Sequence, residues 1–309
     1  MSDTLAVSTP GEQAAAPEGR QPAAQRRALV DVVVRLARYK PLGFAGGLVV
    51  LVLLFVGIFA NFLAPYGFND MSLAQRLSAP SAAHLLGTDN TGRDVLSRII
   101  YGARISMTVG LAGAAIHVVM GFLIGATTGF YGGKLDMVIQ RIVDGIQAFP
   151  TLVLYLTVMS VVGQGLLPLV LVLGLSSSIY GSRTIRSAVL GVKENTYIHA
   201  AVAMGATRGR MLVKHVLPNV VPVLIIEFTL AVGRMILAEA MLSFLGFGVP
   251  PPFPSWGGML SNSGQRYMLQ APWMALWPGV ALALAVFSIN MLGDALRDIL
   301  DPRLRSTMV

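Results

Sequence analysis

Three charged residues, Glu227, Arg234 and Glu239, lie in an otherwise apolar stretch between residues 219 and 246. If this stretch crosses a membrane as a helix, its charges must face protein or water, because a charge in lipid costs about 3 kcal/mol or more. Glu227 and Arg234 are two helical turns apart and therefore share a face. This spacing predicts either a polar path for a solute or an ion pair at an interface with a second membrane subunit, and both remain open.

Side chains that catalyse reactions or bind metals are few. Histidine occurs at positions 84, 117, 199 and 215 without the H-E-x-x-H spacing of a zinc site, and there is no G-x-S-x-G nucleophile motif. The absence of cysteine excludes disulfides and cysteine metal sites. For His117, within an apolar segment, we expect a hydrogen bond to a neighbouring helix rather than a proton relay or a ligand site. The sequence predicts no catalytic residues and no metal site.

The sequence also lacks the G-x-x-x-x-G-K-[ST] loop that binds nucleotide phosphates. Its Gly-Lys pair, Gly133-Lys134, is followed by Leu135 and has no glycine at the required upstream position. Any work driven by ATP must therefore take place in separate subunits. We expect no cofactor in this chain itself.

The composition is that of a membrane protein: 54% of residues are hydrophobic, 12% are charged and the mean hydropathy is +0.68. A bilayer core of about 30 Å needs roughly 20 apolar helical residues. The uncharged run 145–182 is too long for one crossing and contains a turn signal, Gly163-Gln164-Gly165 with Pro168. The sequence predicts an all-α membrane protein with six transmembrane helices, at about 42–63, 105–129, 136–162, 166–187, 219–246 and 273–295.

The distribution of positive charge predicts the orientation. Six crossings place both termini on one side, and the segments on that side hold 17 Lys and Arg against five in the opposite segments. Cytoplasmic loops carry such an excess, so both termini are predicted to be cytoplasmic. This placement also accounts for the net charge of +8 without nucleic acid as a partner.

The chain divides by composition. Residues 1–28 are rich in Ala, Pro, Gln and Gly and predict a disordered cytoplasmic tail. Asp31, Arg35 and Arg38 share one face of a predicted interfacial helix. The predicted divisions are a tail at 1–28, an interfacial helix at 29–41, a first transmembrane helix with an extracytoplasmic segment at 42–104, a core transmembrane domain at 105–303 and a cytoplasmic C-terminus at 304–309.

Glycines at positions 121, 125 and 129 recur every four residues. This spacing gives one helix face without side chains, so that a neighbouring helix can approach closely. On the outer side, prolines 250–252 and 254 with Trp256, Trp273 and Trp277 predict a rigid cap, which either meets another protein or forms an aromatic belt at the lipid interface.

The segment 190–218 is polar but strongly patterned. Gly205 can end a short helix, and Thr207 can cap a second one that carries basic residues and ends at Pro218. Small side chains in this helix-turn-helix would let another protein approach the backbone closely. The predicted docking residues are Tyr197, His199, Ala200, Ala201, Met204, Gly205, Ala206, Thr207 and Arg208.

This loop resembles the EAA loop of permeases of ABC importers. The residues that match its spacing are Ala200, Ala201, Gly205, Leu217 and Pro218. His199 stands where that motif has glutamate and His215 where it has an aliphatic residue, so the role of that glutamate is not carried over.

Three further segments are similar to the C-type permease subunit of dipeptide, oligopeptide and nickel importers. They are His84–Asp94 with Ser97-Arg98 and Tyr101–Arg104, then Leu242–Gly248 with Pro250–Pro252 and Ser255–Gly257, and finally Leu292–Asp294 with Leu296–Asp298 and Leu300–Pro302. The resemblance does not cover the tail before residue 29.

The resemblance implies a type I ABC importer permease in a bacterial inner membrane. The implied partners are a homologous second permease, two ATP-binding subunits that use ATP and Mg, an extracytoplasmic binding protein and membrane lipid. Peptides are the implied substrate, with nickel, glutathione-like compounds or opines as alternatives. An alternative from another class is a dimeric secondary transporter or channel, which would need no docking loop. Broken helices repeated in two halves of the sequence would favour this alternative, but we find no such repeat.

Overall fold

The computed structural model describes residues 33, 34 and 36–300, except for the side chains of residues 262 and 263. The predicted tail at 1–28 and C-terminus at 304–309 lie outside these residues. Of the predicted interfacial helix, residues 33, 34 and 36–39 are described and are helical. The prediction of an all-α membrane protein is confirmed.

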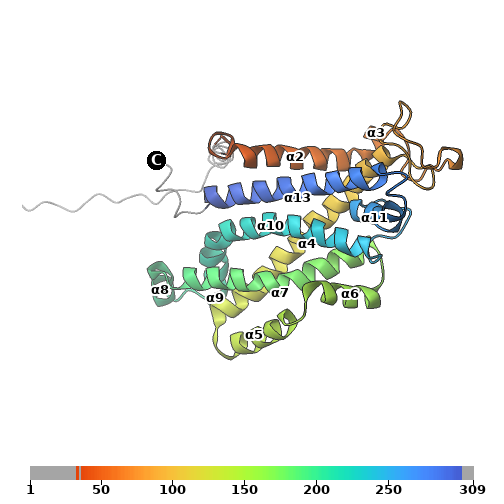
Figure 1. Ribbon diagram of the computed structural model, residues 1–309. Helices are drawn as coiled ribbons and strands as arrows, with labels where there is room; N and C mark the ends of the chain where they lie inside the picture. The colour runs from red at the N-terminus through yellow and green to blue at the C-terminus, as the bar shows by residue number, and fades with distance from the viewer. Residues whose placement is uncertain (1–32, 35, 301–309) are drawn as a thin grey trace, which may run out of the picture.

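Five helices are long and apolar enough to cross a membrane (Figure 1). They lie alongside one another and are α2 (Pro41–Ile58), α4 (Val95–Tyr131), α7 (Leu166–Lys193), α10 (Leu217–Phe244) and α13 (Trp273–Leu300). The shorter elements are α3 (Ala60–Leu63), η1 (Leu73–Gln75), α5 (Gly133–Gln147), α6 (Thr151–Val162), α8 (Thr196–Ala203), α9 (Arg208–Met211), η2 (Leu212–Val216), α11 (Trp256–Leu260) and α12 (Asn262–Arg266).

The predicted transmembrane helix at about 136–162 is broken near its middle. The segment forms α5 and α6, which are bent by 90° at the break between them. Pro150 lies at this break, where a proline disfavours helical backbone at the preceding residue. Two ion pairs hold α5 against α7, Asp136 with Arg186 at 2.6 Å and Asp144 with Arg183. The described residues thus provide five crossings, or six if the bent pair counts as one.

Helix α4 begins ten residues before its predicted start at 105, so the predicted domain boundary at 104/105 falls within a helix. Asp94 is the N-cap and accepts a hydrogen bond from the backbone N–H of Ser97 at 2.7 Å. Arg104 lies within α4, and its guanidinium donates hydrogen bonds to the carbonyls of Gly57 and Ile58 on α2.

The glycine prediction is confirmed. Gly121, Gly125 and Gly129 lie directly against α7, and a Cβ at Gly125 would come within 2.5 Å of the carbonyl oxygen of Ser182. A buried apolar core then joins α4, α6, α7, α10 and α13.

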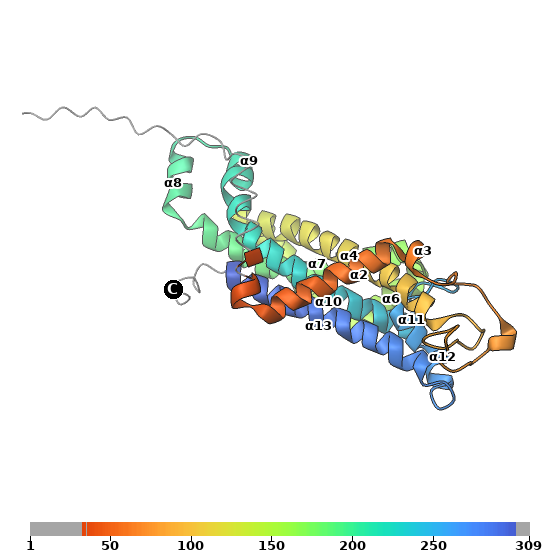
Figure 2. The ribbon, with the colours of Figure 1, turned by 90° about the horizontal axis from the view of Figure 1, so that it is seen from above.

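Different elements lie at the two ends of the molecule. Both views place the start of α2, the end of α13 and helices α8 and α9 at one end, and the 64–94 segment with α11 at the other (Figures 1 and 2). Lys40 and Asp298 form an ion pair of 2.6 Å between the start of α2 and the end of α13.

Candidate functional site

The loop at 190–218 forms the predicted helix-turn-helix. Helix α8 ends before Gly205, whose φ of +78° lies in the left-handed region that glycine adopts without strain. The backbone N–H of Ala206 then donates to the carbonyl of Ala201 at 3.0 Å. Thr207 caps α9 by accepting a hydrogen bond from the backbone N–H of Arg210. These contacts fix a tight turn between two short helices.

The sequence predicted that the second helix ends at Pro218, but in the structure it continues past this residue. Helix α9 passes through the π-helical turn η2 into α10, so that the helix is continuous from Arg208 to Phe244. Pro218 lies within this continuous helix, directly after the π-helical turn η2 and its junction with α10 at Leu217. The loop is therefore joined through one helix to Glu227 and Arg234.

Most of the predicted docking residues face solvent. Met204 is 82% exposed and Tyr197 is 44% exposed. Ala201 is instead buried, and Ile198 packs in an apolar cluster with Met211 and Val216. The exposed or half-exposed members are Tyr197, His199, Ala200, Met204, Gly205, Ala206, Thr207 and Arg208.

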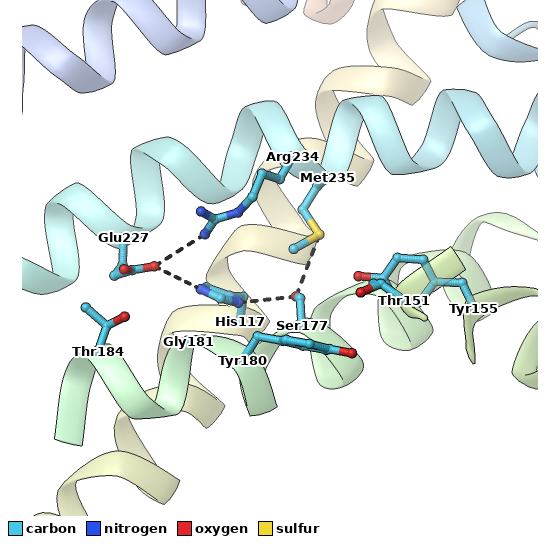
Figure 3. A pocket seen from close by; sticks show the side chains of 10 residues that line it. All are labelled: His117, Thr151, Tyr155, Ser177, Tyr180, Gly181, Thr184, Glu227, Arg234 and Met235. Carbon is cyan, nitrogen blue, oxygen red and sulfur yellow. Dashed lines mark hydrogen bonds and ion pairs between the residues drawn. The ribbon is translucent and has the colours of Figure 1, made fainter. Parts of the chain in front are cut away.

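A charged cavity of about 310 Å³ lies between α4, α6, α7 and α10 (Figure 3). Glu227 Oε2 accepts a hydrogen bond from Arg234 Nη2 at 3.3 Å, and His117 Nε2 lies 3.5 Å from the same oxygen. His117 Nδ1 lies 3.2 Å from Ser177 Oγ on α7. The predicted hydrogen bond from His117 to a neighbouring helix is confirmed, and Glu227 and Arg234 share a face as predicted.

Four hydroxyl groups complete the wall of this cavity. They belong to Thr151 and Tyr155 on α6 and to Tyr180 and Thr184 on α7 (Figure 3). The bend between α5 and α6 places Thr151 at the start of α6, beside the cavity. The sequence carried no signal for these residues, because their assembly depends on how three other helices pack around α10.

Glu239 does not belong to this cavity. Its side chain is fully buried and accepts hydrogen bonds from Ser243 at 2.6 Å and from Ser106 at 3.1 Å. Ser255, at the start of α11, in turn donates to Ser243 at 3.3 Å. Glu239 thus links α10 to α4 and α11 inside the chain.

The segment 64–94, at the end of the molecule opposite α8 and α9, is ordered around Asp89. Its carboxylate accepts hydrogen bonds from the backbone N–H and the hydroxyl of Thr91, both at 2.7 Å, and from the backbone N–H of Arg93 at 3.0 Å. Arg93 Nε donates to the second oxygen at 2.8 Å. Burial raises the pKa of Asp89, but the hydrogen bonds from Thr91 and Arg93 outweigh burial and hold the pKa below its ordinary value.

The tryptophans brace this segment from the other side. Trp256 is fully buried and its indole N–H donates to the carbonyl of Ile99 at 3.1 Å, while Trp273 donates to the carbonyl of Thr88 at 3.0 Å. Trp256 is therefore a core residue of the outer cap and not part of an aromatic belt in the lipid interface.

We expect Asp89→Asn to loosen residues 84–94. An amide N–H₂ at the position of Oδ2 would place a hydrogen-bond donor against the N–H groups of the Arg93 guanidinium. The hydrogen bond between the two side chains would be lost, at a cost of about 2 kcal/mol of local stability. Hydrogen exchange of the Thr91 and Arg93 amides should accelerate by roughly tenfold or more. Asp70→Asn is the control, because exposed Asp70 accepts a single backbone hydrogen bond, from Gly67.

The lowered pKa also sets the pH dependence. Asp89 contributes its stabilisation fully above the ordinary aspartate pKa of about 3.9 and loses it only as pH falls through the lower folded-state value. The difference in amide exchange protection between the unmodified protein and Asp89→Asn should therefore be constant between about pH 5 and 8. A loss of protection that varied across this range would contradict the assignment.

Within the described residues, no group of three His, Cys, Asp or Glu side chains lies close enough to hold a metal ion.

Comparison with known proteins gives two matching family models. Residues 118–306 match the binding-protein-dependent transport system inner membrane component. Residues 31–80 match the N-terminal transmembrane domain of oligopeptide transport permease C. The first match covers the loop at 190–218 and the cavity residues other than His117, and the second covers the first transmembrane helix.

Curated relatives agree with these models. The chain is 38% identical to a dipeptide transport system permease protein of Alkalihalophilus pseudofirmus, over 86% of this chain and 87% of that protein. It is 39% identical to a glutathione transport system permease protein of Pectobacterium atrosepticum, over 85% of this chain and 87% of the relative. A putative peptide permease protein of Brucella suis is 43% identical over 83% of this chain and 86% of its own length.

A solved structure shares the fold. A chain of the MetNI methionine ABC transporter, in an inward-facing conformation, matches with a TM-score of 0.53 and 20% identity, covering 67% of this chain and 97% of that chain. The resemblance stated from the sequence is confirmed by the family models and relatives together. The chain belongs to the family of inner membrane components of binding-protein-dependent transport systems, as a permease of the oligopeptide C type.

Proposed function

We propose that this permease imports peptides or peptide-like solutes, in a complex with a homologous second permease, two ATP-binding subunits and an extracytoplasmic binding protein. The observation that carries the proposal is the exposed loop around Gly205, which continues through η2 into the helix that bears Glu227 and Arg234. The relatives named for dipeptide, glutathione and peptide transport support the substrate class.

The loop transmits the work of the ATP-binding subunits. ATP and Mg act in those subunits, and their closure moves α8 and α9 as a unit because Ile198, Met211 and Val216 share one apolar cluster. The continuous helix carries this movement to the charged cavity, which opens alternately to the two sides of the membrane. Partners on each side must bind the two arrangements with different affinity, since equal affinity would shift nothing.

The proposed orientation places the loop and both termini in the cytoplasm of a bacterium. The end of the molecule with α8 and α9 also carries Lys40, Lys193, Arg208 and Arg297, as the positive-inside rule requires. The segment around Asp89 and α11 then faces the binding protein.

The chain lacks cysteine, so single cysteines can test this orientation. Met204→Cys and Leu269→Cys place a thiol on side chains that are 82% and 100% exposed at opposite ends. A membrane-impermeant maleimide should label Leu269→Cys in intact spheroplasts and Met204→Cys only in inverted vesicles. Met159→Cys, at a position that is 1% exposed, is the control that neither preparation should label. The reverse pattern would overturn the orientation.

Reconstitution tests the function itself. The permease is purified with its partner subunits, placed in proteoliposomes and supplied with the binding protein. We expect accumulation of a labelled dipeptide that requires both ATP and the binding protein. Accumulation of nickel and not of dipeptide would replace the substrate, and uptake driven by an ion gradient without the ATP-binding subunits would identify a secondary transporter.

A further inference from the structure

We propose that the cavity lined by His117, Glu227 and Arg234 is a contact site for a zwitterionic solute, one that carries a free carboxylate and a free ammonium group. This proposal rests on the proposed function, because it assigns a substrate chemistry to the path of the same permease. It goes further in naming which side chain takes which end of the solute.

Arg234 supplies the carboxylate-binding group. Its side chain is 55% exposed, although it lies in the middle of a membrane-spanning helix. A charge at this depth has to face protein or water, and Arg234 lies on the side of the helix that lines the cavity. Among the described residues, the hydrogen-bond partner of Arg234 is Glu227, and this bond involves only Nη2 of the guanidinium. The remaining N–H groups of the guanidinium form the planar fork that binds a carboxylate with two hydrogen bonds.

Glu227 supplies the ammonium-binding group. Both of its contacts, to Arg234 and to His117, are made by the same oxygen, Oε2. In the part of the chain that the structure describes, Oε1 has no hydrogen-bond partner, and the side chain is 13% exposed. A substrate ammonium bound to Oε1 would be attracted by the carboxylate without displacing His117.

The dimensions suit a short peptide. Arg234 Nη2 and Glu227 Oε2 are 3.3 Å apart, so a single short solute can contact both charged groups at once. The volume of about 310 Å³ lies at the lower end of the range for small-molecule sites. The hydroxyls of Tyr155, Tyr180 and Thr184 line the same cavity as the two charged groups and can bond peptide amides.

The same geometry disfavours a bare divalent cation. Glu227 and His117 would offer two ligands, and the Arg234 guanidinium lies 3.3 Å from the carboxylate that would bind the metal. A dication would meet this positive charge directly. A zwitterion instead brings one charge of each sign to a pair that already has one of each.

The test is direct binding to the complete permease and ATP-binding complex in nanodiscs, without the binding protein, so that only the membrane site is measured. The probes are Ala-Ala, its C-terminal amide, propionyl-alanine, which lacks only the amino group, and nickel chloride. In the unmodified complex we expect the amide and propionyl-alanine each to bind about tenfold or more weakly than Ala-Ala, because each loses a charge-assisted hydrogen bond. Nickel should not compete with Ala-Ala.

Two variants assign the groups separately. Arg234→Gln should bind Ala-Ala and its amide equally while still discriminating against propionyl-alanine, and Glu227→Gln should show the converse pattern. Arg234→Lys retains the charge and should keep part of the preference for the carboxylate. Arg141→Gln is the matched control, because the Arg141 side chain is 82% exposed on α5, away from the cavity, and should keep both preferences.

An unchanged carboxylate preference in Arg234→Gln, competition by nickel, or no binding of Ala-Ala to the unmodified complex would each overturn the site. If ATP-driven dipeptide uptake persists at the normal rate in the same variants, the permease function stands and this site alone fails. Loss of uptake from the unmodified complex would instead count against the proposed function.

Discussion

Replacing Gly205 by arginine is expected to abolish ATP-dependent uptake while the chain remains folded in the membrane. A Cβ at Gly205 would meet nothing within 4 Å in the chain itself, so the new side chain extends outward from the turn between α8 and α9. There it would occupy the surface that we assign to the ATP-binding subunit. We expect at least a tenfold loss of uptake and of ATP-binding subunit that copurifies with the permease, equivalent to about 1.4 kcal/mol or more.

The left-handed backbone at Gly205 needs its own control, because any larger residue is strained there by about 1 kcal/mol. Gly163→Arg also replaces a glycine of positive φ in open surroundings, with a φ of +92° against +78° at Gly205, but lies in the turn between α6 and α7 at the opposite end of the molecule. Gly205→Asn tolerates the backbone conformation with a short side chain. Both should retain most of the copurifying ATP-binding subunit. Equal loss in Gly163→Arg, or normal uptake in Gly205→Arg, would contradict the docking role.

Gly125→Val is expected to have the largest effect on folding. A Cβ there would lie 2.5 Å from the carbonyl oxygen of Ser182 and 2.9 Å from the backbone nitrogen of Arg186. These are backbone atoms of α7, so the two helices would have to separate, which costs about 3 kcal/mol or more. The melting temperature of the purified complex and the yield of monodisperse protein should both fall sharply.

Gly191→Val is the matched control for this substitution. Gly191 also lies within a long helix, α7, but a Cβ there would meet nothing within 4 Å. Its melting temperature should stay close to that of the unmodified protein, because valine is slightly better than glycine in a helix. If both variants melted alike, the close approach of α4 to α7 at Gly125 would not be what the Gly125→Val result measures.

Local features of the sequence were sufficient for much of this structure. Hydropathy located the long helices, because the lipid solvent imposes their length and their apolar composition. Thr207 and Gly205 predicted the helix-turn-helix, since capping and positive φ are satisfied by neighbouring residues. Local features did not distinguish the two prolines, because Pro150 lies at a break between helices while Pro218 lies within a continuous helix, directly after a π-helical turn.

The charged site shows what local features leave undetermined. Spacing alone placed Glu227 and Arg234 on one face, but it could not separate Glu239, which hydrogen bonds to Ser106 in the interior. Nor could it bring His117 to Glu227, because that contact depends on the rotation and approach of α4 relative to α10.

The sequence by itself determined that this chain is a membrane-spanning transport subunit with a helix-turn-helix loop and charges within its fifth predicted helix. Only the tertiary structure decided which of those charges face a cavity, which hydroxyls accompany them, and that one continuous helix joins the cavity to the loop. The physical reason is that lipid solvation and helix caps act within a few turns of one helix. A polar site within a bundle is made between helices, at distances set by close contacts such as that of Gly125 with α7.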